Sequence, residues 1–171
     1  MASRVRVHDW AATPLGPAEA WPESWKAVVD LLLAIGFPTV ALWGPNLIQI
    51  YNDGYRELIG DRHPADLGRP GRECRTEAWH IDDPICERVR AGGTVTLEDV
   101  FHPLTRSGSL QDAWFTLPCS PLRDEAGSLA GILVTMVETT ARHRAEQQRS
   151  EAEGELRRGE VRHQSLVESW A

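Results

Sequence analysis

The chain has 171 residues, of which 42% are hydrophobic and 25% are charged, and its formal net charge is −7 at pH 7. These values are typical of a globular protein with one core and an appendage. The acidic balance argues against a nucleic-acid groove, because phosphate contacts require clustered Lys and Arg side chains. The three cysteines, Cys74, Cys86 and Cys119, show no CxxC spacing. We therefore expect a reduced, cytoplasmic protein without a disulfide framework or a metal site.

The first predicted helix begins near Trp21, after a lead-in over residues 1–20 that shows little pattern and is expected to pack loosely. Pro22 suits the first helical turn, and Gly36 with Pro38 ends the helix. Its apolar residues follow helical spacing: Trp21, Trp25, Val28, Val29, Leu32 and Leu33. The most apolar window, 27–44, is interrupted before it reaches the roughly 20 residues that span a bilayer.

A hairpin is predicted next, with strands near 38–43 and 47–52 that flank the turn sequence Gly44-Pro45-Asn46. Ile48 and Ile50 should share one face of the second strand, with Gln49 on the other. Helical spacing resumes after Asn52-Asp53-Gly54. An Asn at this position can cap a helix start through its side-chain oxygen.

The chain then contains short helical pieces over 52–92, broken by Gly and Pro, followed by three more strands near 94–104, 110–121 and 128–138. On the third strand, Val95, Leu97 and Phe101 should share a face, with Asp99 as a polar exception. Short turns join these strands, so they should form an antiparallel meander. The order of elements predicts an α+β fold: a five-stranded antiparallel sheet with short helices on one face.

After Thr140 the composition changes to alternating charges without Pro or aromatic residues, which predicts a helix over 141–165. A weak coiled-coil seam runs along it through Ala141, Ala145, Gln148 and Ala152. Alanine buries little area, so this helix should require a partner or a continuation of the chain.

Five segments carry a resemblance to a known family: TPLGPAEAWPESW (13–25), WGPNLIQIYNDGY (43–55), GDRHPADLGRP (60–70), SPLRDEAGSLAGI (120–132) and VETTARHRAEQ (137–147). In their order and spacing they resemble the PAS sensor domain, in particular the PAS modules at the N-termini of bacterial sensor histidine kinases. The resemblance covers roughly residues 9–146. Residues 160–171 resemble the opening of another such module, so 166–171 are expected to begin a truncated following domain.

The resemblance implies a PAS fold over 21–140 and a signalling helix over 141–165. It implies a sensory input module of a larger receptor, a homodimer through the N-terminal and C-terminal helices, and a downstream PAS or kinase module. VETT (137–140) resembles the junction that ends many PAS domains, which makes Glu138 and Thr140 candidates for signal transmission. A ligand pocket between sheet and helices would be lined by seven residues: Trp43, Ile50, Asn52, Tyr55, Phe101, Phe115 and Met136.

Haem and flavin occur in this family; the sequence leaves the cofactor unknown, with no cofactor as the expectation and haem as the open alternative. Haem would require a histidine from the helix before the third strand, and that stretch (PICERVRAG) holds none. His80 lies just ahead of it, and His102 lies on the third strand. Photoactive flavin domains carry Asn-Cys-Arg, whereas this chain has Glu73-Cys74-Arg75.

Three functions remain open from the sequence. The first is a ligand-sensing input module, and the second is a dimerising relay with a filled core and no ligand. The third is a small α+β isomerase or hydratase, which also uses a curved sheet and an apolar cavity. A stand-alone enzyme has no need of the outgoing helix, and no kinase, Walker or metal-hydrolase motif is present, so we expect no catalysis by this chain.

Overall fold

The computed structural model describes residues 1–76, 79–106 and 108–168. They belong to two compact units, Met1–Glu138 and Thr139–Ala171. The first unit contains every strand, and the second contains the single helix α6 (Thr140–Glu168). Within the described ranges, no helix has an apolar stretch long enough to cross a membrane.

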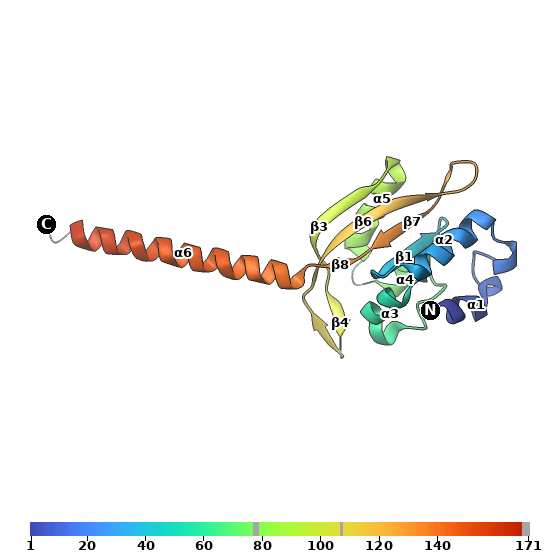
Figure 1. Ribbon diagram of the computed structural model, residues 1–171, viewed down its shortest axis with the longest axis horizontal. Coiled ribbons are helices and arrows are strands. Elements are labelled where there is room, and N and C mark those ends of the chain that lie inside the picture. The colour runs from blue at the N-terminus through green and yellow to red at the C-terminus, as the bar shows by residue number, and fades with distance from the viewer. Residues whose placement is uncertain (77–78, 107, 169–171) are drawn as a thin grey trace. The chain divides into compact units, whose positions relative to one another are not determined.

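An antiparallel sheet forms the centre of the first unit, as Figure 1 shows. Its main strands lie in the order β2-β1-β7-β6-β3, and the short β8 pairs with β6. The predicted α+β fold with a five-stranded antiparallel sheet is thereby confirmed. The strands of this sheet are β1 (Thr39–Trp43), β2 (Ile48–Tyr51), β3 (Val95–Phe101), β6 (Trp114–Arg123), β7 (Leu129–Thr135) and β8 (Val137–Glu138).

The third and fourth predicted strands are each shorter than expected. The predicted strand 94–104 ends at Phe101, and the chain continues into β4 (Leu104–Arg106), which pairs with β5 (Ser109–Gln111) in a separate two-stranded sheet. Pro103 lies between β3 and β4. Proline lacks the N–H that a continuing ladder requires, which accounts for the break at this point.

Helices cover both faces of the sheet. Val40 and Leu42 of β1 line a cavity together with residues of α5 (Trp79–Gly92). Trp43 instead packs against Trp25 of α2 (Glu23–Ala34), with ring centroids 4.6 Å apart. Because side chains alternate along a strand, α2 lies on the face opposite α5. The remaining helical pieces after β2 are α3 (Asp53–Ile59), η3 (Gly60–Arg62) and α4 (Gly71–Cys74).

The N-terminal lead-in packs more closely than the sequence suggested. It contains α1 (Ala2–Val7) and the short turns η1 (Trp10–Ala12) and η2 (Ala18–Ala20). Trp10 is only 2% exposed, and its Nε1–H donates a 2.7 Å hydrogen bond to the Val5 carbonyl. Trp10 also meets Trp21 edge to face, so the two indoles anchor this segment to the core.

The Asn52 side chain binds four backbone groups. Its Oδ1 accepts hydrogen bonds from the backbone N–H groups of Tyr55 and Thr39, both at 3.0 Å. Its Nδ2 donates to the carbonyls of Ile35, at 2.9 Å, and Phe37, at 2.7 Å. The expected helix cap is therefore confirmed, and the same amide also fixes the end of α2 and the start of β1.

Gly54, the third residue of Asn-Asp-Gly, is required by close packing. A Cβ at this position would lie 2.9 Å from the Pro38 backbone nitrogen. The first turn of α3 can therefore approach residues 37–38 closely enough for the Asn52 bonds only if residue 54 has no side chain.

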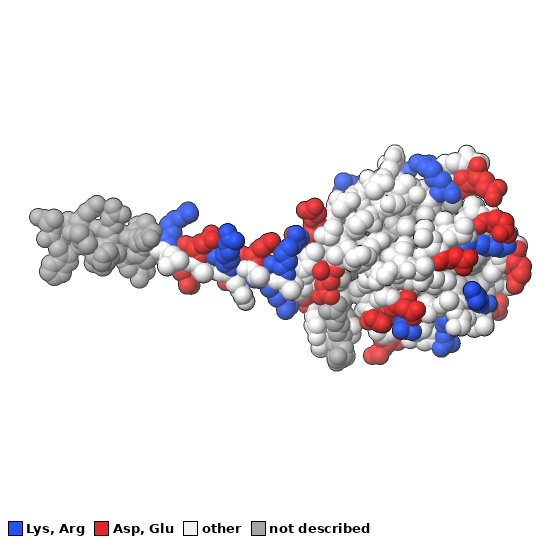
Figure 2. All heavy atoms as spheres, in the orientation of Figure 1, with Lys and Arg blue, Asp and Glu red and all other residues white. Residues whose placement is uncertain are grey.

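The helix α6 begins one residue earlier than predicted. The Thr139 carbonyl accepts the His143 N–H at 2.9 Å, which makes Thr139 the N-cap residue rather than Thr140. Residues 166–168, expected to begin another module, continue the helix, and 169–171 lie outside the described residues. Acidic and basic side chains alternate along the described part of α6 (Figure 2), and the predicted seam residues Ala141, Ala145, Gln148 and Ala152 are all exposed.

Replacing Asn52 by Ala should strongly destabilise the first unit. The change removes the Asn52 partner of two buried N–H groups and of the Ile35 carbonyl, and each unsatisfied buried group costs about 1–3 kcal/mol, whereas the Phe37 carbonyl keeps the Thr39 hydroxyl. We expect Asn52→Ala to lower the free energy of unfolding by about 3–5 kcal/mol in urea denaturation. The control is Asn46→Ala, in the exposed β1–β2 turn. Equal losses in the two variants would contradict the tethering role.

Candidate functional site

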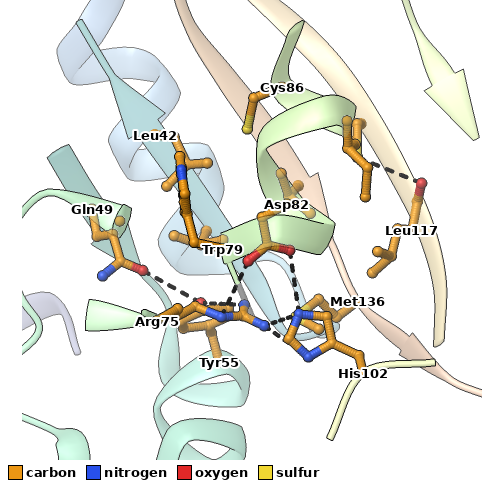
Figure 3. Close-up of a pocket in the computed structure, with 15 residues that line it drawn as sticks. Leu42, Gln49, Tyr55, Arg75, Trp79, Asp82, Cys86, His102, Leu117 and Met136 are labelled. Carbon is orange, nitrogen blue, oxygen red and sulfur yellow. Dashed lines mark hydrogen bonds and ion pairs between the residues drawn. The ribbon is translucent and has the colours of Figure 1, made fainter. Parts of the chain in front are cut away.

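A small cavity of about 40 Å³ lies between the sheet and α5. About 10–15 Å³ of such space holds one water molecule, so the cavity has room for a few water molecules. Its apolar wall comes from β1, β6, β7 and α5, and its polar wall comes from five side chains on different elements (Figure 3). The lining residues are Val40, Leu42, Gln49, Tyr55, Gly71, Arg75, Trp79, Asp82, Ile85, Cys86, His102, Leu117, Cys119, Val134 and Met136.

Arg75 is the centre of the polar wall. Its Nε lies 3.4 Å from Oδ2 of Asp82, and its Nη2 lies against both ring nitrogens of His102, with Nδ1 at 2.8 Å. Asp82 also contacts His102, with Oδ1 and Nε2 separated by 3.2 Å. Arg75, Asp82 and His102 therefore form a closed triangle at the cavity, which Figure 3 shows.

A chain of hydrogen bonds extends the cluster to the sheet edge. Nη1 of Arg75 donates to the Tyr55 hydroxyl at 3.2 Å, and this hydroxyl donates to Oε1 of Gln49 at 3.4 Å. Because a guanidinium group only donates, the Tyr55 hydroxyl acts as acceptor on one side and donor on the other. The five polar residues thus link β2, α3, the segment after α4, α5 and the end of β3.

Local backbone structure places these side chains. Arg75 immediately follows the four-residue helix α4, which ends at Cys74. His102 sits in the break between β3 and β4, where its N–H still donates to the Ala113 carbonyl at 2.8 Å. Asp82 lies in the first turn of α5, where the helix dipole also favours a negative charge.

Electrostatics keep the Asp82 carboxyl ionised. Burial alone would raise the pKa of Asp82, but the charge of Arg75 and the hydrogen bond from His102 outweigh it, so this pKa lies below its usual value. Burial raises the pKa of Tyr55, and the charge of Arg75 opposes this only in part. Arg75 and Asp82 therefore form a pair of opposite charges, with a neutral phenol between the guanidinium and Gln49.

The two cysteines at the cavity are poor nucleophiles. Burial raises the pKa of Cys86 to about 12 and that of Cys119 to about 11. A thiol becomes reactive when its pKa is lowered by nearby positive charge, which is the opposite of this environment.

Two of the seven predicted pocket residues, Tyr55 and Met136, line the cavity. Trp43 and Ile50 lie on the opposite face of the sheet. Trp43 packs on α2. Ile50 pairs with Ala41, whose side chain is on the same face of β1 as Trp43, two residues along the strand. The prediction assigned Trp43 and Ile50 to the pocket because they are hydrophobic residues of the hairpin. Hydrophobic residues occur on both faces of this hairpin, because α2 covers one face and the cavity lies on the other.

The other three predicted pocket residues also lie elsewhere. Phe101 is 43% exposed because of a bulge between Leu97 and Val100, where Asp99 has a φ of 50°. The bulge brings Val100 opposite Phe115 and leaves Phe101 opposite Trp114. The expectation that Phe101 shares the face of Leu97 is therefore wrong. Phe115 is buried on the cavity side near His102, and the amide of Asn52 is used by backbone groups.

Sequence reasoning missed Gln49, Arg75 and Asp82 as cavity residues. Gln49 was noticed only as the residue that points away from two isoleucines. The available signal for Gln49 was its place as a polar residue inside an apolar run. The structure buries every residue of that run, which forms β2. Arg75 follows the four-residue helix α4, and Asp82 lies in the first turn of α5, and neither position carries a periodic pattern in the sequence.

The residues present do not fit haem or flavin. Drug-sized and cofactor ligands occupy pockets of about 300–1,000 Å³, far above the volume of this cavity. The ring nitrogens of His102 contact Arg75 and Asp82, and His80 is exposed. The Cys74 thiol points to the Asp66 carbonyl, 3.9 Å away, and burial raises its pKa to about 12.

The Asp82 carboxylate should stabilise the fold in a pH-dependent way. Since its pKa is lowered from about 3.9 in an unfolded chain, the stabilisation is complete above about pH 5 and is lost as the pH falls through the folded-state pKa. Asp82→Asn leaves Arg75 buried without its anion, which should cost about 3–5 kcal/mol at pH 7.

The measurement is urea denaturation of the wild type and Asp82→Asn between pH 3 and pH 7. The gap between their free energies of unfolding should narrow below about pH 4. Asp83→Asn, one residue along α5, removes the same charge outside the cluster and serves as the control. A gap that is constant with pH would show that Asp82 is not held ionised by Arg75.

Comparison with known proteins gives structural likeness and no sequence match. No protein-family model matches the sequence, and no curated protein matches it. An RNA-binding light-oxygen-voltage (LOV) receptor superposes with a TM-score of 0.58 at 20% identity, over 84% of this chain and 41% of that one. This chain thus spans less than half of that receptor's length.

Two further solved structures share the arrangement. The PAS domain of BvgS from Bordetella pertussis has a TM-score of 0.56 at 17% identity, over 78% of this chain and 99% of that one. The LOV protein of Rhodobacter sphaeroides has a TM-score of 0.53 at 13% identity, over 68% of this chain and 66% of that one. Taken with the sheet order and helix placement described above, this likeness shows that the chain has the PAS fold.

Proposed function

We propose that the chain is a sensory input module of a larger bacterial receptor and that the cavity beside Arg75 receives its stimulus, a small ligand. The observation that carries the proposal is the buried Arg75–Asp82–His102 cluster, which lines a cavity between the sheet and its helices. Buried ionisable groups gathered at a cavity are typical of functional sites rather than of stable cores.

The cluster offers a route from ligand to output. A ligand that changes the contacts of Arg75 would act at once on Tyr55 of α3, Asp82 of α5 and His102 between β3 and β4. The strand β6, which follows β5, pairs with β7 and β8, and the chain passes from β8 directly into α6. A displacement of the sheet would therefore reach α6 through the chain itself.

A ligand-free relay is the second candidate, and the size of the cavity favours it. A volume of about 40 Å³ leaves room for only a few heavy atoms. The cluster also satisfies much of its own hydrogen bonding, as a structural core network would. Catalysis of an isomerase or hydratase type is a weaker fit, because a substrate would need a larger open pocket.

The parent protein and partners belong to the same proposal. The sequence segments that resemble sensor histidine kinases support a kinase parent with a further PAS or kinase module after α6, in the cytoplasm. The exposed alanine seam of α6 and the amphipathic α2 support a homodimer in that parent. Incorporation of phosphate from ATP into a histidine of the full-length protein would test the kinase assignment.

Ligand binding should be detectable as thermal stabilisation. A ligand at about 100 times its Kd adds about 2.7 kcal/mol, which raises Tm by about 5–10 °C for a protein of this size. A library of small metabolites should therefore contain compounds that raise Tm of the wild type. Val134→Leu places an extra methylene in the cavity and should remove the effect, whereas Val137→Leu, in β8 away from the cavity, should retain it.

A compound that stabilises both leucine variants equally binds elsewhere and would not support the proposal. If no compound separates the two variants, the ligand-free relay replaces the ligand sensor.

The junction before α6 should control how firmly the helix start is held. Glu138, Thr139 and Thr140 are the candidates, and the N-cap role belongs to Thr139. Loss of an N-cap Thr costs about 1 kcal/mol, too little to unfold the first unit. In Glu138→Ala/Thr139→Ala we therefore expect faster amide exchange in the first turns of α6 and unchanged exchange in β1 and β7.

Ser150→Ala, in the middle of α6, is the matched control for the loss of a hydroxyl. Hydrogen exchange with mass spectrometry reports both regions in one sample. If the double variant and the control exchange alike, the junction does not hold the helix start, and its proposed role in transmission fails.

A further inference from the structure

Arg75 presents a carboxylate-binding group to the cavity. Its side chain is only 10% exposed, and its three nitrogens contact Asp82, His102 and Tyr55. A guanidinium is planar and binds carboxylates and phosphates through two parallel N–H groups, so the rest of the cavity must distinguish between these two classes of anion. The neighbouring Tyr55 hydroxyl donates its hydrogen to Gln49 at 3.4 Å, and it can donate to a ligand oxygen if it gives up this long bond.

Asp82 occupies the position of such a carboxylate, but with a long contact. The Nε–Oδ2 separation is 3.4 Å, whereas charge-assisted N–H···O bonds are usually about 2.7–2.9 Å. The Asp82 side chain is 17% exposed, against 1% for His102. Asp82 therefore stands at the border of the cluster, where its carboxylate can turn towards water if another anion takes its place.

The rest of the cavity sets the size and character of a ligand. Leu42, Ile85 and Met136 contribute apolar side chains to the lining of the cavity. The volume of about 40 Å³ accepts only a short chain beyond a carboxylate. Phosphate fits this cavity less well than a carboxylate. Its oxygens that do not face Arg75 or Tyr55 would lie against the apolar lining, where they would lose water without gaining a hydrogen-bond donor.

We propose that the ligand of this cavity is a short monocarboxylate of the formate and acetate class, bound by Arg75 and Tyr55 in exchange for Asp82. This inference rests on the proposed sensory function and names the class of its stimulus. Release of Asp82 removes the contact that joins the first turn of α5 to Arg75, so binding changes the restraint on α5. Asp82 thus acts as an internal competitor that sets the concentration range of the response.

The competition makes opposite predictions for two charge changes. Arg75→Gln removes the guanidinium and should abolish acetate binding. Asp82→Asn removes the competing anion and should tighten acetate binding about tenfold, equivalent to about 1.4 kcal/mol. Arg90→Gln is the control, because Arg90 pairs with Glu87 on the outer side of α5, 2.6 Å away.

The experiment is a titration of the whole 171-residue chain with sodium acetate, followed by Tm and by tryptophan fluorescence, since Trp79 lines the cavity. Sodium chloride at equal ionic strength, acetamide and inorganic phosphate are the comparison solutes. We expect saturable changes with acetate in the wild type, in Arg90→Gln and, at lower concentration, in Asp82→Asn. Arg75→Gln, acetamide and phosphate should give none.

Three results would overturn the inference. Binding of acetate by Asp82→Asn alone would show that Asp82 is a permanent partner of Arg75. Equal binding of acetate and acetamide would show that charge is not recognised. The third result is a library compound that has no carboxylate and that still binds Arg75→Gln but no longer binds Val134→Leu. Such a compound would support the sensory function and refute this ligand class. Should Arg75→Gln not fold, the comparison of Asp82→Asn with the wild type still decides.

Discussion

The hydrogen bonds of one buried amide, Asn52, determine the arrangement on which the cavity depends. An Asn side chain has two donor hydrogens and two acceptor lone pairs, and Asn52 uses all four on backbone groups. The end of α2, the start of β1 and the start of α3 are consequently held at fixed distances. Val40 and Leu42 follow directly on β1, and Tyr55 lies in the first turn of α3, so two walls of the cavity are positioned by this side chain.

The cavity itself departs from what stability alone would select. Desolvating Arg75 and Asp82 costs several kcal/mol, and replacing a buried ion pair by apolar residues of similar volume is often neutral or stabilising. The sheet and α5 supply Leu, Ile, Val and Met around the pair, so an apolar core was chemically available. The proposed recognition of a ligand gives the buried pair of Arg75 and Asp82 a role that packing alone does not require.

The sequence predicted those features that depend on local chemistry. Alternation and turn residues identified the sheet strands, and the Asn-Asp-Gly motif identified the helix cap at Asn52. The face of Phe101 could not be predicted, because a bulge at Asp99 changes the register without changing composition. Arg75 was equally hidden: its partners lie at Tyr55, Asp82 and His102, and only the folded chain brings them together.

The same bulge has a consequence for how copies of the protein behave at high concentration. The outer edge of β2 is covered by residues 68–71, through bonds such as Gln49 N–H to the Arg69 carbonyl, whereas β3 is the other outer strand of the sheet. An edge strand with free backbone groups can recruit a second molecule and start amyloid-like growth. The irregular backbone at Asp99 and the charge of Glu98 interrupt such a template. Two copies that meet at high concentration therefore encounter an irregular, charged edge at β3 instead of a flat one.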